Sequence, residues 1–300
     1  MKKATTAFLL LLFLGKTWAQ DKHFTQFYAV PQESRPLDQI GVNASAASRE
    51  LALRVYTTRL LGGEPRLVLH GGGNTSVKTT ARDTLGEEVE VLCVKGSGWD
   101  MGVIEPPGLP AVRLQPLRKL YALDRLSDED MVNFQRVNLL DASAPNPSVE
   151  TLFHAFLPHK FIDHTHANAV LALSDQPNGA ELCREVYDGR CAIVDYVMPG
   201  FALAKMATEA AKKMPRAEGL ILLQHGIFSW GETAKEAYDR MIELVGLAAA
   251  RLAKGRRNVF AAGTLPAKLA SPAEVAPTLR GLAAIPVRLR RRLVKGAQHD

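Results

Sequence analysis

The sequence predicts an α/β domain, and the arrangement of apolar segments and glycines supports this prediction. Short apolar runs that end at glycine, such as residues 88–94 and 219–230, are typical of buried strands. Longer segments with apolar residues at helical spacing lie between these runs, and the longest covers residues 232–254. Hydrophobic residues make up 47% of the 300-residue chain, so it can bury a sizeable core.

The predicted elements follow one another without an internal repeat. Strands are expected at 66–70, at 88–94, around His164, onward through 169–173, at 192–198, and at 219–230 as a hairpin through Gly226. Helices are expected at 44–61, in part of 119–140, and at 179–187, 201–213 and 232–254. Another helix is expected to open at Ser148, because Pro145 and Pro147 exclude a helix before it.

The two ends of the chain differ in composition from its centre. In residues 1–19, Lys2 and Lys3 precede an apolar run and small residues at a cleavage position, which is typical of a secretory signal. This run is too short to span a bilayer as a helix. Residues 20–43 are interpreted as a linker, 44–260 as the folded domain, and 261–300 as a basic tail rich in proline and alanine.

Charge and cysteine usage restrict the classes of partner. The net charge is +6, and a cluster of arginines at 288–292 contributes to it. No aromatic residues are interleaved with that cluster to stack on bases, so we expect a solvated tail and neither a nucleic-acid nor a membrane partner. The three cysteines, Cys93, Cys183 and Cys191, lack metal-ligand spacing and form no disulfide framework, which favours a reducing compartment.

Three histidines are candidate ligands for a metal ion. His164 and His166 are two residues apart in a predicted strand, so their side chains leave the same face. His225 ends the apolar run that begins at Leu220 and is the third candidate. Three protein ligands with one open position are typical of a catalytic zinc site, and another divalent metal is also possible.

Glu150 is the candidate acid/base. A carboxylate held beside a metal site suggests metal-assisted proton transfer, and a carboxyl group whose pKa is tuned toward neutrality suits general acid–base catalysis. The alternative is that Glu150 only stabilises the start of a helix through the helix dipole.

Two glycine-rich turns are candidate anion sites. Residues 71–78 begin with three glycines, whose amides could form a phosphate-binding nest together with the side chains of Asn74 and Ser76. Residues 95–99 form a second such turn, with a cation at Lys95 and a hydroxyl group at Ser97. Neither turn matches the P-loop or the dinucleotide fingerprint, and a plain tight turn is the alternative for each.

In this order, the motifs at 71–78, 95–99, 147–150, 164–167 and 222–226 resemble those of class II aldolases in the aldolase/adducin family. The resemblance covers about residues 45–260 and is nearest to the aldolase half of bifunctional rhamnulose-1-phosphate aldolase/alcohol dehydrogenase proteins. It implies a central, largely antiparallel sheet flanked by helices, in a homotetramer with sites near the subunit interfaces. The segment between Glu150 and His164 is shorter than in fuculose-phosphate aldolases.

The resemblance also implies a role for each site residue. His164, His166 and His225 would bind zinc, and Glu150 would be the catalytic acid/base. The substrate phosphate would contact Asn74, Ser97, Gly98 and Ser148. The reaction would cleave a ketose 1-phosphate, with rhamnulose 1-phosphate as the best candidate, to dihydroxyacetone phosphate and an aldehyde. Such chemistry favours the cytoplasm, whereas the signal-like leader argues for export.

Two other functions are compatible with the same motifs. A sugar-phosphate epimerase or dehydratase of this fold would keep the three histidines but use a different set of acids and bases. A non-catalytic, adducin-like binding module would have lost the metal, and the presence of all three histidines with Glu150 argues against it. Zinc content separates an enzyme from such a module.

Overall fold

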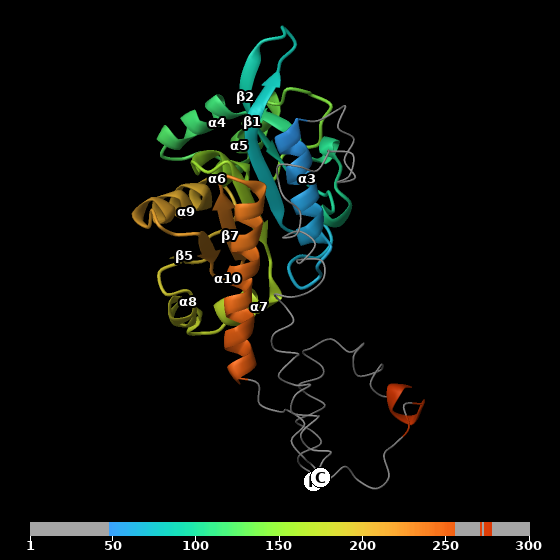
Figure 1. Cartoon of the computed structure of the whole chain (residues 1–300), viewed down its shortest axis with the longest axis vertical. Helices are drawn as coiled ribbons and strands as arrows, with labels where there is room; N and C mark the ends of the chain where they lie inside the picture. Colours follow the sequence, from blue (N-terminus) through green and yellow to red (C-terminus); the bar gives the residue numbers. More distant parts are fainter. Residues whose placement is uncertain (1–47, 256–270, 272, 278–300) are drawn as a thin grey trace. The chain divides into compact units, whose positions relative to one another are not determined.

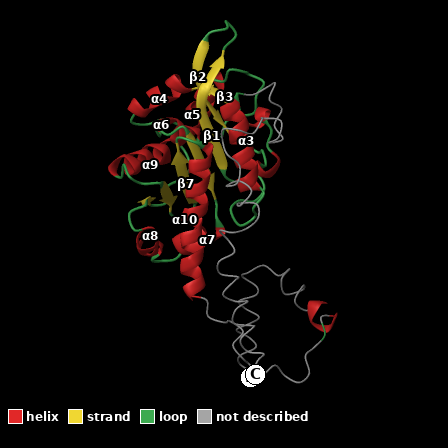
Figure 2. Ribbon diagram, in the orientation of Figure 1, coloured by secondary structure: helices red, strands yellow, loops and turns green. Residues whose placement is uncertain are grey.

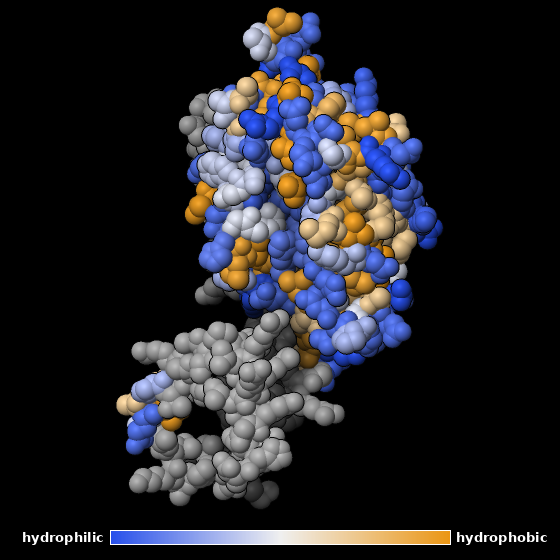
Figure 3. Space-filling model, turned by 180° about the vertical axis from the view of Figure 1, so that it is seen from behind, coloured by the Kyte–Doolittle hydropathy of each residue, from blue (hydrophilic) through white to orange (hydrophobic). Residues whose placement is uncertain are grey.

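A computed structural model describes residues 48–255, 271 and 273–277 of the chain. The signal-like leader at 1–19, the linker at 20–43 and the arginines of the basic tail lie outside the described residues. Within the described helices, none is long and apolar enough to cross a membrane. Figure 3 shows hydrophobic and hydrophilic residues interspersed on one face of the described domain.

A seven-stranded sheet forms the centre of the domain, with strand order β3-β2-β1-β4-β7-β6-β5 (Figure 2). All neighbouring strands are antiparallel except β5 and β6, which are parallel. This confirms the predicted α/β class with a largely antiparallel sheet. The strands are β1 (Asn74–Arg82), β2 (Glu88–Val94), β3 (Ala111–Arg113), β4 (Phe161–Thr165), β5 (Cys191–Val194), β6 (Gly219–Leu222) and β7 (Gly226–Gly231).

Helices cover both faces of the sheet (Figure 1). Within residues 48–255, the α-helices are α3 (Arg49–Gly62), α4 (Leu114–Lys119), α5 (Asp128–Val137), α6 (Thr151–Phe156), α7 (Asn168–Ser174), α8 (Gly179–Tyr187), α9 (Phe201–Lys213) and α10 (Ala234–Gly255). Short 3₁₀ turns lie at η2 (Met101–Val103), η3 (Pro106–Gly108) and η4 (Leu120–Ala122). Buried residues of α4, α5, α6 and α9 pack together on one face, whereas α3, α7, α8 and α10 supply the other.

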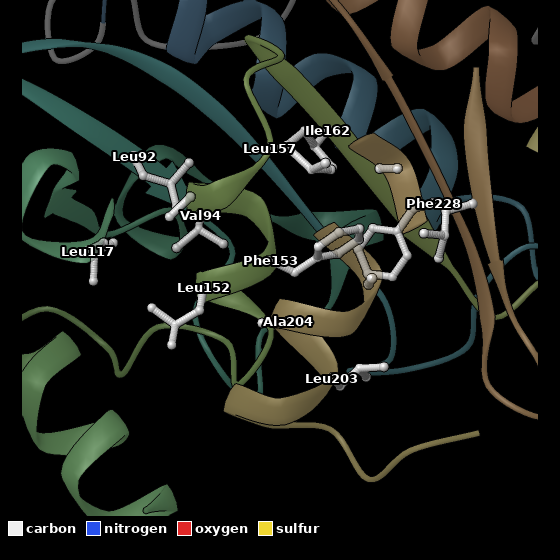
Figure 4. Close-up of a cluster of buried hydrophobic side chains, with 14 of the residues drawn as sticks. Leu92, Val94, Leu117, Leu152, Phe153, Leu157, Ile162, Leu203, Ala204 and Phe228 are labelled. Atoms are coloured by element: carbon white, nitrogen blue, oxygen red, sulfur yellow. The ribbon is translucent and has the colours of Figure 1, made fainter. Parts of the chain in front are cut away.

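The face that carries α6 has an aromatic centre (Figure 4). Phe153 of α6 meets Phe228 of β7 edge to face, with 4.6 Å between the ring centroids. The buried side chains of Leu152 on α6 and Ile162 on β4 belong to the same cluster. Helix α6 is therefore anchored against the two strands that carry the candidate site.

Several predicted elements are confirmed by the structure. The predicted bounds at 88–94, 179–187 and 201–213 coincide with β2, α8 and α9. The predicted hairpin at 219–230 consists of β6 and β7, which pair antiparallel. The chain turns between them at residues 223–225, where Gln224 adopts a left-handed backbone conformation with φ of 60°.

Two predicted strands are wrong. Residues 66–70 form a turn, because the amides of Leu67 and Val68 both donate to the carbonyl of Glu64. The side chains of Leu67 and Val68 are buried in the core. Residues 169–173 lie in helix α7, where Val170 and Leu173 are three apart and both face the core. A short apolar run fits a strand and a buried helix equally well, and here helical packing prevails.

A buried ion pair fixes the face of β4 that lies under α3. Arg54 of α3 and Asp163 of β4 approach within 2.5 Å, and both side chains are fully buried at 0% exposure. The Arg54 guanidinium also donates to Thr57 Oγ1 at 2.6 Å. Burial raises the pKa of Asp163, while the adjacent Arg54 lowers it. Each charge therefore depends on the other for compensation.

We predict that Arg54→Met lowers the free energy of unfolding by about 3–5 kcal/mol, because it leaves Asp163 buried without its partner. The double variant Arg54→Met/Asp163→Leu should recover much of this loss, since no charge then stays buried. Urea denaturation measures both. Glu209→Gln serves as the control, because it removes an exposed pair with Lys212, worth at most about 1 kcal/mol. A double variant as unstable as Arg54→Met would contradict this account.

Candidate active site

The candidate site lies where several strand ends meet. His164 lies on strand β4, directly opposite Asn74 of β1 and Phe228 of β7. His166 follows the end of β4, and His225 immediately precedes β7. Because β1 and β7 both run antiparallel to β4, their first residues lie next to its last ones.

The structure brings the three predicted histidines together. One candidate ligand atom from each of His164, His166 and His225 can be chosen so that all lie within 4.8 Å of one another. The Nε2 atoms of His164 and His166 are 3.0 Å apart. The ring of His164 stacks on Phe228 with 4.0 Å between centroids, which fixes its plane.

Glycines make this close approach possible. A Cβ atom on Gly226 would lie 2.5 Å from the carbonyl oxygen of Thr165 and 3.0 Å from Cε1 of His164. Gly73 has φ of 61°, and its Cβ would lie 2.7 Å from the carbonyl oxygen of His164. Both positions therefore require glycine for space, and Gly73 requires it also for its backbone conformation.

The donor set fits a divalent ion such as zinc. His164 Nδ1 donates to the carbonyl oxygen of Ile227 at 3.0 Å, which leaves the lone pair of Nε2 directed at the other histidines. A second hydrogen bond of this kind is typical of metal-binding histidines. His225 Nδ1 and Glu150 Oε1 are buried without hydrogen-bond partners among the described residues. A cation would compensate such atoms.

The histidines are held neutral, as metal ligands must be. Burial lowers the pKa of His164 well below its usual value, and the neighbouring His166 and His225 lower it further. Burial likewise lowers the pKa of His225 to about 4. The pKa of His166 is lowered by burial and then by the charge of Lys95.

Glu150 lies immediately before helix α6, and not inside a helix that opens at Ser148 as predicted. Its carbonyl accepts from the amides of Phe153 and His154, so it is the N-cap residue of α6. The helix therefore opens at Thr151 and not at Ser148, whose hydroxyl group instead accepts from the Glu150 amide at 3.3 Å. Of the Glu150 carboxylate, Oε2 is 3.3 Å from His164 Nε2 and Oε1 is 3.5 Å from His225 Nε2.

The surroundings of Glu150 tune its acidity. Burial raises its pKa to about 7, whereas a hydrogen bond from Asn74 and the charge of Lys95 oppose this rise. Asn74 Nδ2 donates to Glu150 Oε2 at 2.6 Å and to Ser148 Oγ at 3.1 Å. A carboxyl group with a pKa near neutrality can both accept and release a proton.

The glycine-rich turns meet beside the carboxylate. Lys95 Nζ donates to the carbonyl oxygen of Gly71 at 2.9 Å, and the Lys95 carbonyl accepts from the amide of Ser148. A Cβ on Gly71 would lie 3.7 Å from the carbonyl oxygen of Gly98. Ser97 and Gly98 are exposed, and Gly98 has φ of 82°. The turns at 71–73 and 96–98 therefore lie side by side.

The predicted anion nest over residues 71–78 is wrong in part, since β1 begins at Asn74. Alternation along β1 directs Ser76 into the core, where its hydroxyl group meets His154 Nδ1 at 2.7 Å. Lys95, expected at the surface or on an anion, is instead buried and only 3% exposed. The signal for Ser76 and His154 was present: Ser76 shares a strand face with Asn74, and His154 is one helical turn beyond Glu150.

A family model and a solved structure both relate this chain to class II aldolases. Residues 52–252 match the family described as Class II Aldolase and Adducin N-terminal domain. The chain is 37% identical in sequence to the solved N-terminal class II aldolase domain of a conserved protein from Thermoplasma acidophilum, with a TM-score of 0.64. That similarity covers 75% of this chain and 100% of the other.

Two curated proteins are also similar in sequence. Uncharacterized oxidoreductase YuxG of Bacillus subtilis (strain 168) is 39% identical over 191 residues, which are 64% of this chain and 28% of that protein. Methylthioribulose-1-phosphate dehydratase of Pectobacterium atrosepticum is 33% identical over 114 residues, which are 32% of this chain and 56% of that protein. The matched part thus spans about a quarter of the first relative and about half of the second.

We predict that His166→Ala removes most of the bound metal from the purified protein without unfolding it, because a ligand of a three-histidine set is lost. Zinc content by atomic absorption and the far-UV circular dichroism spectrum are measured on one preparation. His159→Ala is the matched control, because His159 stacks on Trp230 and lies outside the histidine set. Stoichiometric zinc in His166→Ala would contradict the assignment.

Proposed function

Because the chain belongs to the Class II Aldolase and Adducin N-terminal domain family, we propose that it is a metal-dependent aldehyde-lyase acting on a ketose 1-phosphate. The leading candidate substrate is rhamnulose 1-phosphate, and the products are dihydroxyacetone phosphate and an aldehyde. The observation that carries the proposal is the buried oxygen Oε1 of Glu150, which has no hydrogen bond within the described part of the chain and lies 3.5 Å from His225 Nε2.

The proposed roles follow from the chemistry of the side chains. A zinc ion held by His164, His166 and His225 would stabilise the negative charge that develops on the ketone half when the carbon–carbon bond breaks. Glu150 delivers a proton to the carbon of that half. The net change is the transfer of a proton from a hydroxyl oxygen of the aldehyde half to this carbon.

The proposed phosphate subsite uses the exposed turn beside Glu150. The amide of Ser97 donates to the carbonyl of Asn146, which fixes the turn while its hydroxyl group stays exposed. Ser148 Oγ accepts two N–H groups, so its own proton is free to be donated to a phosphate oxygen. Gly98 allows close approach of the backbone. The side chain of Asn74 faces Glu150 instead, and its amide group is already engaged.

Dehydration of a sugar phosphate is the second candidate, favoured by the similarity to methylthioribulose-1-phosphate dehydratase. Such a reaction also needs a carboxylate that moves a proton at carbon, but it releases water and leaves the carbon skeleton intact. A panel of ketose 1-phosphates, assayed with and without a chelator, separates the two. Release of dihydroxyacetone phosphate identifies the lyase, whereas loss of water from an intact skeleton identifies the dehydratase.

The proposal also extends to assembly and compartment. The resemblance to class II aldolases supports a homotetramer that acts in the cytoplasm, and sedimentation velocity tests the oligomeric state. Fractionation of cells that express the full chain tests the compartment against the signal-like leader.

We predict that Glu150→Gln lowers kcat by about 10²–10⁴, the range for loss of general acid–base catalysis. Zinc content and melting temperature should stay near the wild-type values, because a glutamine oxygen can still accept the hydrogen bond from Asn74. All three quantities are measured on the same preparation. A lower melting temperature with unchanged kcat would reduce Glu150 to a helix-capping residue.

We further predict that Ser97→Ala raises KM for a phosphorylated ketose far more than for its unphosphorylated counterpart. The loss of one hydrogen bond to a charged group corresponds to about 1.5–3 kcal/mol. Ser143→Ala is the matched control, because the Ser143 hydroxyl group is exposed and bonds only locally, to Asp141. Equal weakening of both substrates would exclude the turn as the phosphate subsite.

A further inference from the structure

A chain of buried hydrogen bonds leads from the interior of the sheet to the carboxylate of Glu150. Ser76 Oγ lies 2.7 Å from His154 Nδ1, and His154 Nε2 lies 2.6 Å from Asn74 Oδ1. Asn74 Nδ2 then lies 2.6 Å from Glu150 Oε2. Ser76 and His154 are fully buried, and Asn74 and Glu150 nearly so.

The chemistry of the groups determines which atom donates and which accepts in each of these hydrogen bonds. A carboxylate oxygen accepts, so the atom of Asn74 that faces Glu150 is its amide nitrogen, and the atom that faces His154 is its carbonyl oxygen. That oxygen can only accept, so His154 Nε2 carries a proton. His154 is neutral because burial keeps its pKa well below the usual value, so its Nδ1 accepts and Ser76 donates.

The direction of these bonds distinguishes the two oxygens of Glu150. Oε2 accepts from Asn74, whereas Oε1 has no hydrogen-bond partner among the described residues. A carboxylate held through one oxygen cannot rotate freely about its terminal bond. Oε2 also lies 3.3 Å from His164 Nε2, so both oxygens lie beside the histidines. Oε1, 3.5 Å from His225 Nε2, is the one left without a hydrogen bond from the described residues.

We propose that Ser76 and His154 are positioning residues that act through Asn74 to fix the Glu150 carboxylate, so that Oε1 is the oxygen that exchanges a proton with the substrate. This inference rests on the proposed function in so far as Glu150 is the acid/base. Ser76 and His154 are fully buried, so they act through Asn74 and not on the substrate directly. Their effect is to prevent the Asn74 amide from flipping, which would turn an oxygen toward the carboxylate.

The arrangement explains why buried polar groups are present beside an apolar core. Phe153 and Phe228 lie on the same face of the sheet, and the His154 ring is 5.6 Å from that of Phe228. Water is excluded there, so breaking any of these hydrogen bonds leaves a buried polar group without a partner. The network therefore adopts one orientation. Loss of the Ser76 hydroxyl group removes the donor to Nδ1 of His154, so the ring keeps only its bond to Asn74 and holds that side chain less firmly.

The kinetic test compares two hydroxyl groups on neighbouring residues of β1. Ser76→Ala removes the first donor of the chain. Thr75→Val is the matched control, because Thr75 faces the opposite side of the sheet and its buried hydroxyl group pairs with Thr58 Oγ1 at 2.7 Å. Both variants lose one buried hydrogen bond. A role in stability alone predicts similar behaviour for the two.

We expect Ser76→Ala to lower kcat by about 10², the effect of misplacing a catalytic group by about 1 Å. KM and zinc content should stay near the wild-type values, and Thr75→Val should keep kcat near that of the wild type at a similar melting temperature. An equal loss of kcat in both variants, or none in Ser76→Ala, would overturn the inference.

A substrate-free measurement separates this inference from the proposed function. Nitrogen-15 NMR of the zinc-loaded wild-type protein should show His154 as the neutral tautomer protonated at Nε2. The side-chain amide signals of Asn74 should shift in Ser76→Ala and not in Thr75→Val. A proton on Nδ1 of His154, or unshifted Asn74 signals, would overturn the inference even if the enzyme cleaves ketose 1-phosphates. Inactivity toward every ketose 1-phosphate overturns the proposed function instead, and the NMR result still decides the positioning.

Discussion

The central position of β4 is the constraint on which the rest of the domain depends. Every residue of this strand is buried, so the polar side chains on each of its two faces need partners inside the protein. One face places Asp163 against Arg54, and the other presents His164 to Phe228 and to the carboxylate of Glu150. A shift of one residue in register would exchange these faces, which would bury His164 under α3 and expose Asp163 to the aromatic core.

The sequence predicts the site better than it predicts the frame that holds it. The histidines follow from strand alternation and from an apolar run that ends at a polar residue, and the structure brings them together. The apolar run at 169–173 suits a strand and a buried helix equally by its length, and only packing against α10 selects the helix. The turn at 66–70 depends on the carbonyl of Glu64, a contact that no periodicity reveals.

Burial was the property that sequence reasoning could not supply for polar groups. Lys95 follows a buried strand in a glycine-rich turn, which suggests a surface cation or an anion contact, yet its amine is directed inward to the carbonyl of Gly71. Ser76 likewise suggests an anion contact because it follows three glycines. Its actual partner, His154, is 78 residues away in the sequence and is brought near by α6 packing on the sheet.

The hydrogen bond between Asn74 and Glu150 joins residues 76 positions apart, and His225 lies on a third, later segment. No short segment of the chain can therefore assemble this cluster. The cluster forms only after strands far apart in the sequence have paired, and such non-local pairing is slow. An ion or small molecule that needs all three segments binds the native state and not the unfolded chain. Its binding energy therefore adds to the stability of the whole sheet, which couples the abundance of the folded protein to the supply of its ligand.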